Sequence, residues 1–431
     1  MSRTLDVPEN KARIIWERET KVTTGKGLLK VRVRVTARGG GVGGVKLFHN
    51  GKALGGASRG IRVRDRCVNS AGRRGNRDLP SGRSEIYCFA VQLVAGKNTL
   101  RAVASSRQHI DSRPRVAELV YRPPKGVEKP DLYLFVVGIN KYRNSRLNLN
   151  YGRPDAEMVS HVIQAKARPL FRRIHSYKLY DLKATRPAIE RVFHQIGASA
   201  RSQDVFLFYY AGHGITPVKN PEFYLVPSNV TQLYSREKLR QGALSGDQLV
   251  KLSKGIAALK QVFLIDACGA GGLKTAFAMR GSAEEKALAQ LQRSSGFFMV
   301  AATESQQVAT EFGKLKHGVF TYAMLEAFEN IKDNKTLTIR QLTAYLEQRV
   351  PELTAKYRGT EQFPLALGTG QDFPLLLKTV KASPFQASRP KSEQALKPAR
   401  PAARKGCSKA EFLALKKMGF SVREALQQCN P

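Results

Sequence analysis

The sequence predicts an α/β protein with a mostly parallel, three-layer sheet, preceded by a β-sandwich domain. Continuous apolar runs, each short enough to be a buried strand, alternate with stretches of helical pattern: 132–139, 204–211, 261–266 and 296–302. Strands that are apolar on both faces are typical of parallel sheets covered by helices. The chain before residue 125 instead carries short alternating strands, without helices between them. We therefore expect two folded domains of different class.

Composition shifts set the expected boundaries. A linker rich in proline and glycine separates the two domains, and a basic segment rich in proline and alanine follows the second. The predicted parts are a β-sandwich at 1–125, a linker at 126–130, an α/β domain at 131–378, a disordered tether at 379–406 and a helical hairpin at 407–431.

The amino-terminal domain shows strand and turn signals in order. Residues 29–36 alternate valine with basic side chains, and Asn50-Gly51 predicts a tight hairpin turn. Residues 87–94 and 99–104, joined by 95–98, predict a second hairpin, and 116–121 closes the domain. Strands at this spacing suggest a sandwich of immunoglobulin type. The arginine-rich segment 58–85 within it is either a solvated insertion, which we favour, or a loop that binds phosphate or acidic groups.

The second domain alternates strands and helices after residue 131. Helices are expected at 154–167, with Asp155 and Glu157 in the first turn, at 185–198, at 245–258 and at 318–330, and a short strand at 175–179. At 407–431, two short helices break at Gly419. A hairpin this small needs a disulfide between Cys407 and Cys429 or a partner to be stable.

The charge is strongly positive. The 431 residues include 72 basic and 34 acidic side chains, giving +38, spread along the chain. A potential of that sign attracts nucleic acid, anionic membranes or acidic proteins without identifying any of them. The hydrophobic content of 42% is that of a globular protein that folds without help.

Localisation stays open on sequence grounds. No run of 18 apolar residues occurs and the start is polar, which favours the cytoplasm. The cysteines admit two readings. Pairs Cys67/Cys88 and Cys407/Cys429 with Cys268 left as a free thiol would suit an exported enzyme, whereas four reduced structural cysteines would suit a reducing compartment.

Two predicted strands end on reactive side chains. The strand at 204–211 runs into Gly212-His213-Gly214, and the strand at 261–266 runs into Ala267-Cys268-Gly269. Because carboxyl ends of parallel strands meet at one edge of a sheet, a thiol and an imidazole can lie together there. The histidines and cysteines show no metal-ligand spacing, so we expect no metal and no cofactor.

These motifs resemble the caspase-like cysteine peptidases, and more closely their bacterial and metacaspase branch than the animal caspases. His213 precedes Cys268 in the family's order, and residues 131–142 and 153–158 resemble its opening strand and first helix start. The resemblance covers about 130–376. Gly269 and Ala270 stand where many relatives have histidine and serine.

The resemblance implies a mechanism and a specificity. His213 would be the general acid/base and Cys268 the nucleophile, with the amide N–H groups of Gly214 and Cys268 as oxyanion donors. Asp155 and Asp266 match positions that, in the metacaspase-like branch, line a pocket for a basic side chain. The expected activity is therefore cleavage of proteins or peptides after Arg or Lys.

Self-processing would follow from that specificity. Residues 273–295 carry Lys274, Arg280 and Arg293, in a region where family members commonly have a cleavable linker, and Arg280-Gly281 is the best candidate bond. The protein would then be a zymogen. The alternative is an inactive caspase-like scaffold that binds nucleic acid or an acidic protein through its basic surface.

Overall fold

The computed structural model describes most of the two predicted domains. The described residues are 13–16, 22–23, 27–38, 41–54, 68–69, 80–106, 111–123, 128–215, 223–233, 235–267, 298–302, 316–332, 335–358, 361–367 and 372–377. The predicted tether at 379–406, the hairpin at 407–431 and most of the arginine-rich segment lie outside them. Within the described part, no helix is long and apolar enough to cross a membrane.

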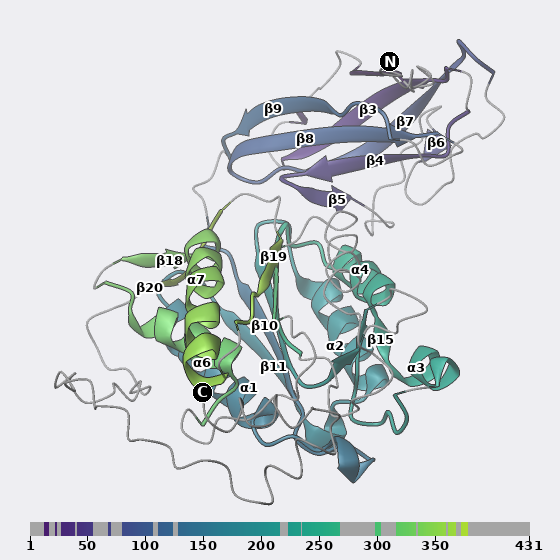
Figure 1. Ribbon diagram of the computed structural model, residues 1–431. Coiled ribbons are helices and arrows are strands. Elements are labelled where there is room, and N and C mark those ends of the chain that lie inside the picture. The colour runs from purple at the N-terminus through teal and green to yellow at the C-terminus, as the bar shows by residue number, and fades with distance from the viewer. Residues whose placement is uncertain are drawn as a thin grey trace, which may run out of the picture. The chain divides into compact units, whose positions relative to one another are not determined.

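Two sheets form the amino-terminal part (Figure 1). One has the order β1-β3-β7-β6, with β2 also paired to β3, and the other has the order β5-β4-β8-β9. The strands are β1 (Arg13–Trp16), β2 (Val22–Thr23), β3 (Leu28–Thr36), β4 (Gly44–His49), β5 (Lys52–Leu54), β6 (Val68–Asn69), β7 (Ser84–Gln92), β8 (Gly96–Ser105) and β9 (Arg115–Tyr121). Apolar side chains of both sheets share one core, and the valines of β3 supply part of it.

One predicted hairpin in this region is confirmed and the other is wrong. Asn50 and Gly51 have φ of +50° and +90°, the left-handed conformations that a two-residue turn between β4 and β5 needs. β7 and β8, in contrast, lie in different sheets. The buried Asn98 side chain forms hydrogen bonds with the backbone of Val94 and Gly96. These bonds stabilise the turn through which the chain passes from one sheet to the other.

One cysteine of this region is oxidised. Cys88 lies on β7 and is disulfide-bonded. Its partner lies outside the described residues. β6, which begins one residue after Cys67, runs parallel to β7 and pairs Asn69 with Cys88. The sequence allows either paired or reduced cysteines, and for Cys88 the disulfide favours the paired state.

A six-stranded sheet forms the second domain, in the order β11-β10-β12-β16-β17-β19. Its strands are β10 (Leu132–Gly138), β11 (Ile174–Tyr180), β12 (Val205–Ala211), β16 (Lys260–Asp266), β17 (Phe298–Ala301) and β19 (Leu365–Leu367). All neighbours pair parallel except β17 with β19. The predicted mostly parallel α/β sheet is confirmed.

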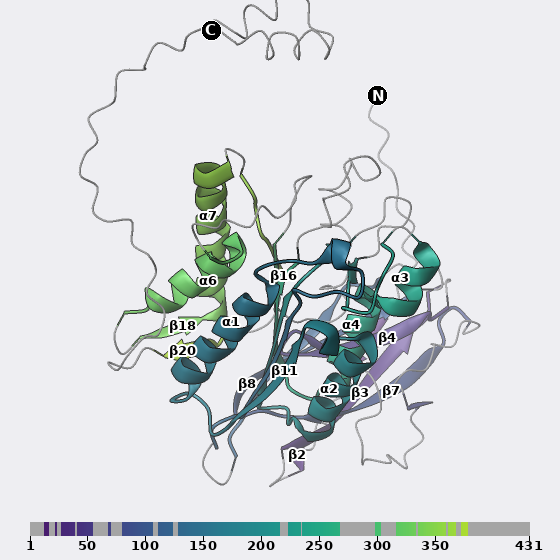
Figure 2. The same ribbon diagram turned by 90° about the horizontal axis from the view of Figure 1, so that it is seen from below.

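Helices cover both faces of this sheet, which makes three layers (Figure 2). The helices are α1 (Gly152–Ala167), α2 (Arg186–Ser199), α3 (Arg236–Gly242), α4 (Gly246–Gly255), α6 (Val319–Glu329) and α7 (Ile339–Arg358). One apolar core joins α1, α6 and α7 to alternate strand residues, and a second joins α2 and α4 to the others. Small pieces complete the domain: η1 (Ser145–Leu147), η2 (Asp181–Lys183), β13 (Gly214–Ile215), β14 (Tyr224–Leu225), β15 (Leu244–Ser245), β18 (Thr336–Thr338) and β20 (Pro374–Leu377).

Local signals explain the helix bounds. The Thr185 hydroxyl caps α2, and Ser245 with Gln248 forms a capping box at α4. α4 ends at Gly255 rather than at 258, because the chain already turns there toward β16. α7, which the sequence analysis does not predict, contains Pro351 in its interior.

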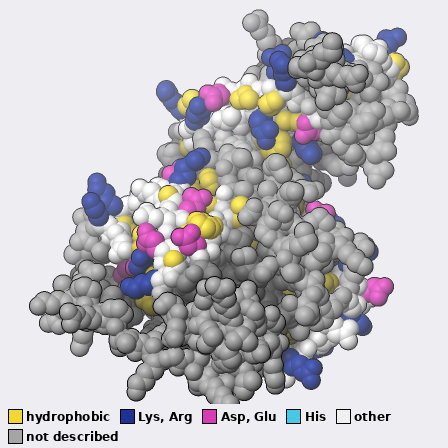
Figure 3. Space-filling model, in the orientation of Figure 1, with side chains coloured by type: hydrophobic (Ala, Val, Ile, Leu, Met, Phe, Trp, Pro, Cys, Tyr) yellow, Lys and Arg dark blue, Asp and Glu magenta, His cyan; other side chains and the backbone are white. Residues whose placement is uncertain are grey.

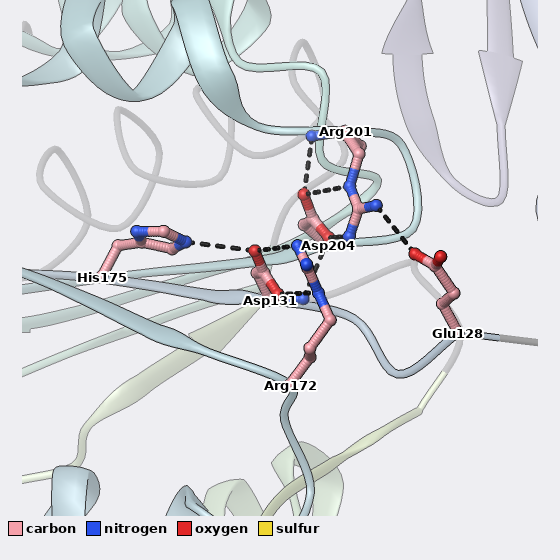
Figure 4. Close-up of polar contacts among 6 residues, drawn as sticks. All are labelled: Glu128, Asp131, Arg172, His175, Arg201 and Asp204. Atoms are coloured by element: carbon pink, nitrogen blue, oxygen red, sulfur yellow. Dashed lines mark hydrogen bonds and ion pairs between the residues drawn. The ribbon is translucent and has the colours of Figure 1, made fainter.

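Ion pairs fix the amino-terminal edge of the sheet (Figure 4). Asp131, buried just before β10, accepts two hydrogen bonds from Arg172 at 2.9 and 2.7 Å and one from His175 at 3.1 Å. Asp204, buried just before β12, binds Arg201, which also reaches Glu128. Burial pushes the pKa of Asp131 upward, but the His175 and Arg172 hydrogen bonds and the nearby positive charges outweigh it and leave that pKa below 3.8.

Candidate active site

His213 lies at the opposite, carboxyl-terminal edge of the sheet, two residues after β12. Its imidazole Nε2 lies 2.8 Å from the carbonyl oxygen of Leu147. A carbonyl can only accept, so Nε2 carries a proton and Nδ1 is the atom left to take one up. Burial lowers the pKa of His213, and the Leu147 hydrogen bond offsets part of that effect. The neutral, basic form of the ring is therefore favoured.

The loop that brings Leu147 to the histidine is itself tied down. Asn144 caps η1 by accepting from the N–H of Arg146, and its amide donates to the Thr231 carbonyl. Asn148, directly after Leu147, accepts from the N–H of Tyr142 at 2.9 Å. These bonds fix the carbonyl that orients the imidazole.

Two buried tyrosines hold the backbone of His213. The Tyr142 hydroxyl accepts from the His213 N–H at 2.9 Å, and its ring lies 5.1 Å from the imidazole. The Tyr210 hydroxyl donates toward the carbonyls of His213 and Val226, at 3.0 and 2.8 Å. A side chain at Gly212 would come within 2.9 Å of one hydroxyl and 3.0 Å of the other, so only glycine fits there.

The strand that carries the predicted nucleophile lies next to the histidine strand. β12 and β16 pair in register, with Ala211 opposite Asp266, and the Gly212 N–H donates to the Asp266 carbonyl at 3.2 Å. A side chain at Gly214 would lie 3.0 Å from the Cβ of Ala267, the residue before Cys268. The two strand ends therefore meet. Cys268 itself and the predicted cleavage sites Lys274, Arg280 and Arg293 lie outside the described residues.

Asp155 and Asp266, 111 positions apart in number, approach the same point from different elements. Asp155 lies in the first turn of α1 and Asp266 ends β16. A methyl group on Gly318 would lie 3.0 Å from Oδ2 of Asp266 and 3.2 Å from Oδ2 of Asp155. The two aspartates therefore form an acidic pair at the carboxyl-terminal edge of the sheet, where His213 also lies.

Donors from the start of α6 hold both carboxylates. Asp155 Oδ1 accepts from His317 Nδ1 at 2.5 Å, and its Oδ2 accepts from the Gly318 N–H at 3.0 Å. Asp266 Oδ2 accepts from the Thr321 hydroxyl at 2.5 Å.

A buried tyrosine extends this network. The Tyr209 hydroxyl lies 2.7 Å from Thr321 Oγ1, so it donates there while Thr321 donates to Asp266. Burial and the negative charges of Asp266 and Asp155 keep the pKa of Tyr209 well above 10.0. Tyr209 is thus a neutral donor at any ordinary pH.

The sequence alone does not predict a role for several of these residues: Leu147, Tyr142, Tyr210, His317 and Thr321. Leu147 acts through its carbonyl, which has no side-chain signal. His317 and Thr321 flank the expected start of a helix at Gly318, and a histidine with a hydroxyl beside an N-terminal glycine was the available signal.

A metal site in the described part of the chain would need several His, Cys, Asp or Glu side chains close together. No group of three or more His, Cys, Asp or Glu residues there could hold a metal ion. Figure 3 shows basic side chains dispersed over one face of the described surface, with acidic side chains among them.

A mostly parallel six-stranded sheet with helices on both faces is an α/β fold of the kind that caspase domains have. The family model of the caspase domain, peptidase family C14, matches residues 133–372, more than half of the chain. The chain therefore belongs to this family of cysteine peptidases.

Other comparisons are weaker. Protein GSU0716 of Geobacter sulfurreducens is 16% identical, with 57% of this chain and 97% of that chain covered and a TM-score of 0.39. Fibronectin(III)-like modules of Clostridium thermocellum CbhA are 13% identical, with 26% and 99% covered and a TM-score of 0.18. At these scores neither bears on fold or function. No curated protein matches the chain.

Proposed function

We propose that the protein is a cysteine endopeptidase with a His213/Cys268 dyad that cleaves after Arg or Lys. The observation that carries the specificity is the pairing of Asp155 with Asp266 around Gly318, at the sheet edge that holds His213. Two carboxylates at one point attract a guanidinium or ammonium group and repel an acidic side chain.

The orientation of His213 supports a proton path for this dyad. Nε2 is bound to the Leu147 carbonyl, so Nδ1 takes the thiol proton of Cys268. The thiolate electron pair then forms the bond to the scissile carbonyl carbon. The carbonyl oxygen becomes the oxyanion, held by the amide N–H groups of Gly214 and Cys268.

Collapse of this intermediate breaks the C–N bond, and His213 returns its proton to the leaving amine. A water molecule then gives a proton to His213 and attacks the thioester. Its breakdown releases the carboxylic acid and regenerates the Cys268 thiol.

The parts of the chain outside the proposed active site would have accessory roles. We propose that the amino-terminal sheets are an immunoglobulin-like sandwich joined by the linker at 126–130 to the peptidase domain at 131–378. Cleavage at Lys274, Arg280 or Arg293 would make the enzyme self-processing.

The test is turnover of matched fluorogenic peptides that end in Arg, Lys or Asp. Wild type should cleave the Arg and Lys peptides and leave the Asp peptide intact. Cys268→Ala and His213→Ala should each abolish cleavage while keeping the wild-type circular dichroism and melting transition. Full activity in either variant contradicts the dyad, and unchanged Arg turnover in both Asp266→Ala and Asp155→Ala contradicts the pocket.

A further inference from the structure

The two residues before α6 and the first turn of that helix supply three hydrogen-bond donors to the two acidic side chains. They are the His317 ring, the Gly318 N–H and the Thr321 hydroxyl. We propose that His317 is a positioning residue that sets the preference for Arg over Lys, by fixing the plane of the Asp155 carboxylate. The inference rests on the proposed function, because it concerns the same acidic pocket.

Asp155 is held at both of its oxygens. The His317 ring donates to Oδ1 and the Gly318 amide donates to Oδ2. The terminal torsion of an aspartate is broad, so a single donor would leave the carboxylate free to turn about it. Two donors on two oxygens remove that freedom. The carboxylate of Asp155, which is 2% exposed, therefore presents one fixed plane.

The backbone just before α6 has an unusual conformation that places His317 and Gly318 next to Asp155. Lys316, one residue before His317, has φ of +54°, in the left-handed region that non-glycine residues seldom adopt. Such a conformation persists where the surrounding structure imposes it, and such residues cluster at functional sites. The turn at Lys316 brings the chain to α6 with both His317 and Gly318 facing Asp155. The amino-terminal end of α6 also favours nearby negative charge.

A fixed carboxylate plane matters more for arginine than for lysine. A guanidinium is planar and binds a carboxylate through two parallel hydrogen bonds, so it needs the plane to match its own. An ammonium is a compact point charge with rotatable donors and tolerates a turned carboxylate. Loss of the His317 donor should therefore reduce Arg recognition more than Lys recognition.

The first experiment compares three variants of the full chain on the Arg and Lys peptides. His317→Leu removes the donor, and His317→Asn keeps an N–H near the position of Nδ1. His175→Leu is the matched control: His175 also binds an aspartate, at 3.1 Å, but at the opposite edge of the sheet. A seven-residue strand separates the edges by about 20 Å.

His317→Leu should raise KM for the Arg peptide about tenfold, the loss expected for a hydrogen bond to a charged group, with kcat changed less. The Arg/Lys ratio of kcat/KM should fall with it, and His317→Asn should restore most of that ratio. His175→Leu should keep the wild-type ratio. An unchanged Arg/Lys ratio in His317→Leu, or a ratio in His317→Asn as low as in His317→Leu, overturns the inference.

A binding measurement separates this inference from the peptidase assignment. Calorimetry with Nα-acetyl-arginine amide on the Cys268→Ala protein, with and without His317→Leu, needs no turnover. If wild type cleaves no peptide but the amide binds and His317→Leu weakens binding, the peptidase function fails and the role of His317 stands. If the amide does not bind, or binds equally well after His317→Leu, the role of His317 is wrong.

Discussion

Removing the Tyr142 hydroxyl, which accepts a hydrogen bond from the His213 N–H, should impair catalysis without altering the proposed substrate pocket. In Tyr142→Phe the ring stays against the imidazole, but the His213 N–H loses the acceptor at 2.9 Å. Tyr142 is 4% exposed, so water does not replace that acceptor. An unpartnered buried N–H costs about 1–3 kcal/mol. Part of that cost should appear as lower stability, and part as a less well-placed imidazole.

If about half of it, about 1 kcal/mol, falls on the transition state, kcat drops about fivefold, since about 1.36 kcal/mol is a factor of ten. KM for the Arg peptide should stay near the wild-type value, because the Asp155 and Asp266 network does not include Tyr142. The assay is steady-state kinetics with urea unfolding monitored in parallel. Tyr345→Phe is the control, because its hydroxyl also accepts an N–H, from Asn330 at 3.3 Å, on α7. A Tyr142→Phe enzyme with wild-type kcat, or with kcat reduced only as much as in Tyr345→Phe, would refute the positioning role.

Four further outcomes are expected. The acid limb of kcat/KM should lie below pH 6.5, since burial lowers the pKa of His213 and the neutral ring is the base; a limb above 6.5 contradicts this. The pKa of folded Asp131 lies below 3.8, so its contribution to stability is present above that pH and lost as the pH falls through the folded pKa; Asp131→Asn should flatten this acid dependence in denaturant titrations. Cys88 should resist alkylation until reductant is added, and reduction should cost about 2–4 kcal/mol of unfolding free energy. Wild type should yield fragments split near Arg280 and Cys268→Ala a single chain, whereas intact mass for both, while peptide is turned over, excludes self-processing.

The sequence predicts the sheet and its helices well because their signals are local. Buried strands show as continuous apolar runs, and Thr185 and Ser245 mark helix starts within one residue. α7 had a signal too, since Ile339, Leu342 and Leu346 recur at helical spacing, but Pro351 interrupts the pattern. The β7–β8 hairpin failed as a prediction because a turn signal does not say whether the chain stays in one sheet.

The site residues also differ in whether the local sequence predicts them. His213 and Asp266 are predictable as residues that end apolar strands. The pairing of Asp155 with His317 is not, because it joins residues 162 positions apart through one hydrogen bond. The Leu147 carbonyl is likewise set by the path of a loop and not by residue type.

The order of synthesis gives the carboxylate pair a further property. Asp155 and Asp266 are translated before the turn that holds them, and Thr321 follows Asp266 by 55 residues. Until α6 has left the ribosome and docked, the carboxylates lack the His317, Gly318 and Thr321 donors. A growing chain that already contains His213 and Cys268 therefore lacks the donors that hold the two carboxylates. The proposed recognition of basic residues would begin only once the carboxy-terminal part of the domain has folded onto the sheet.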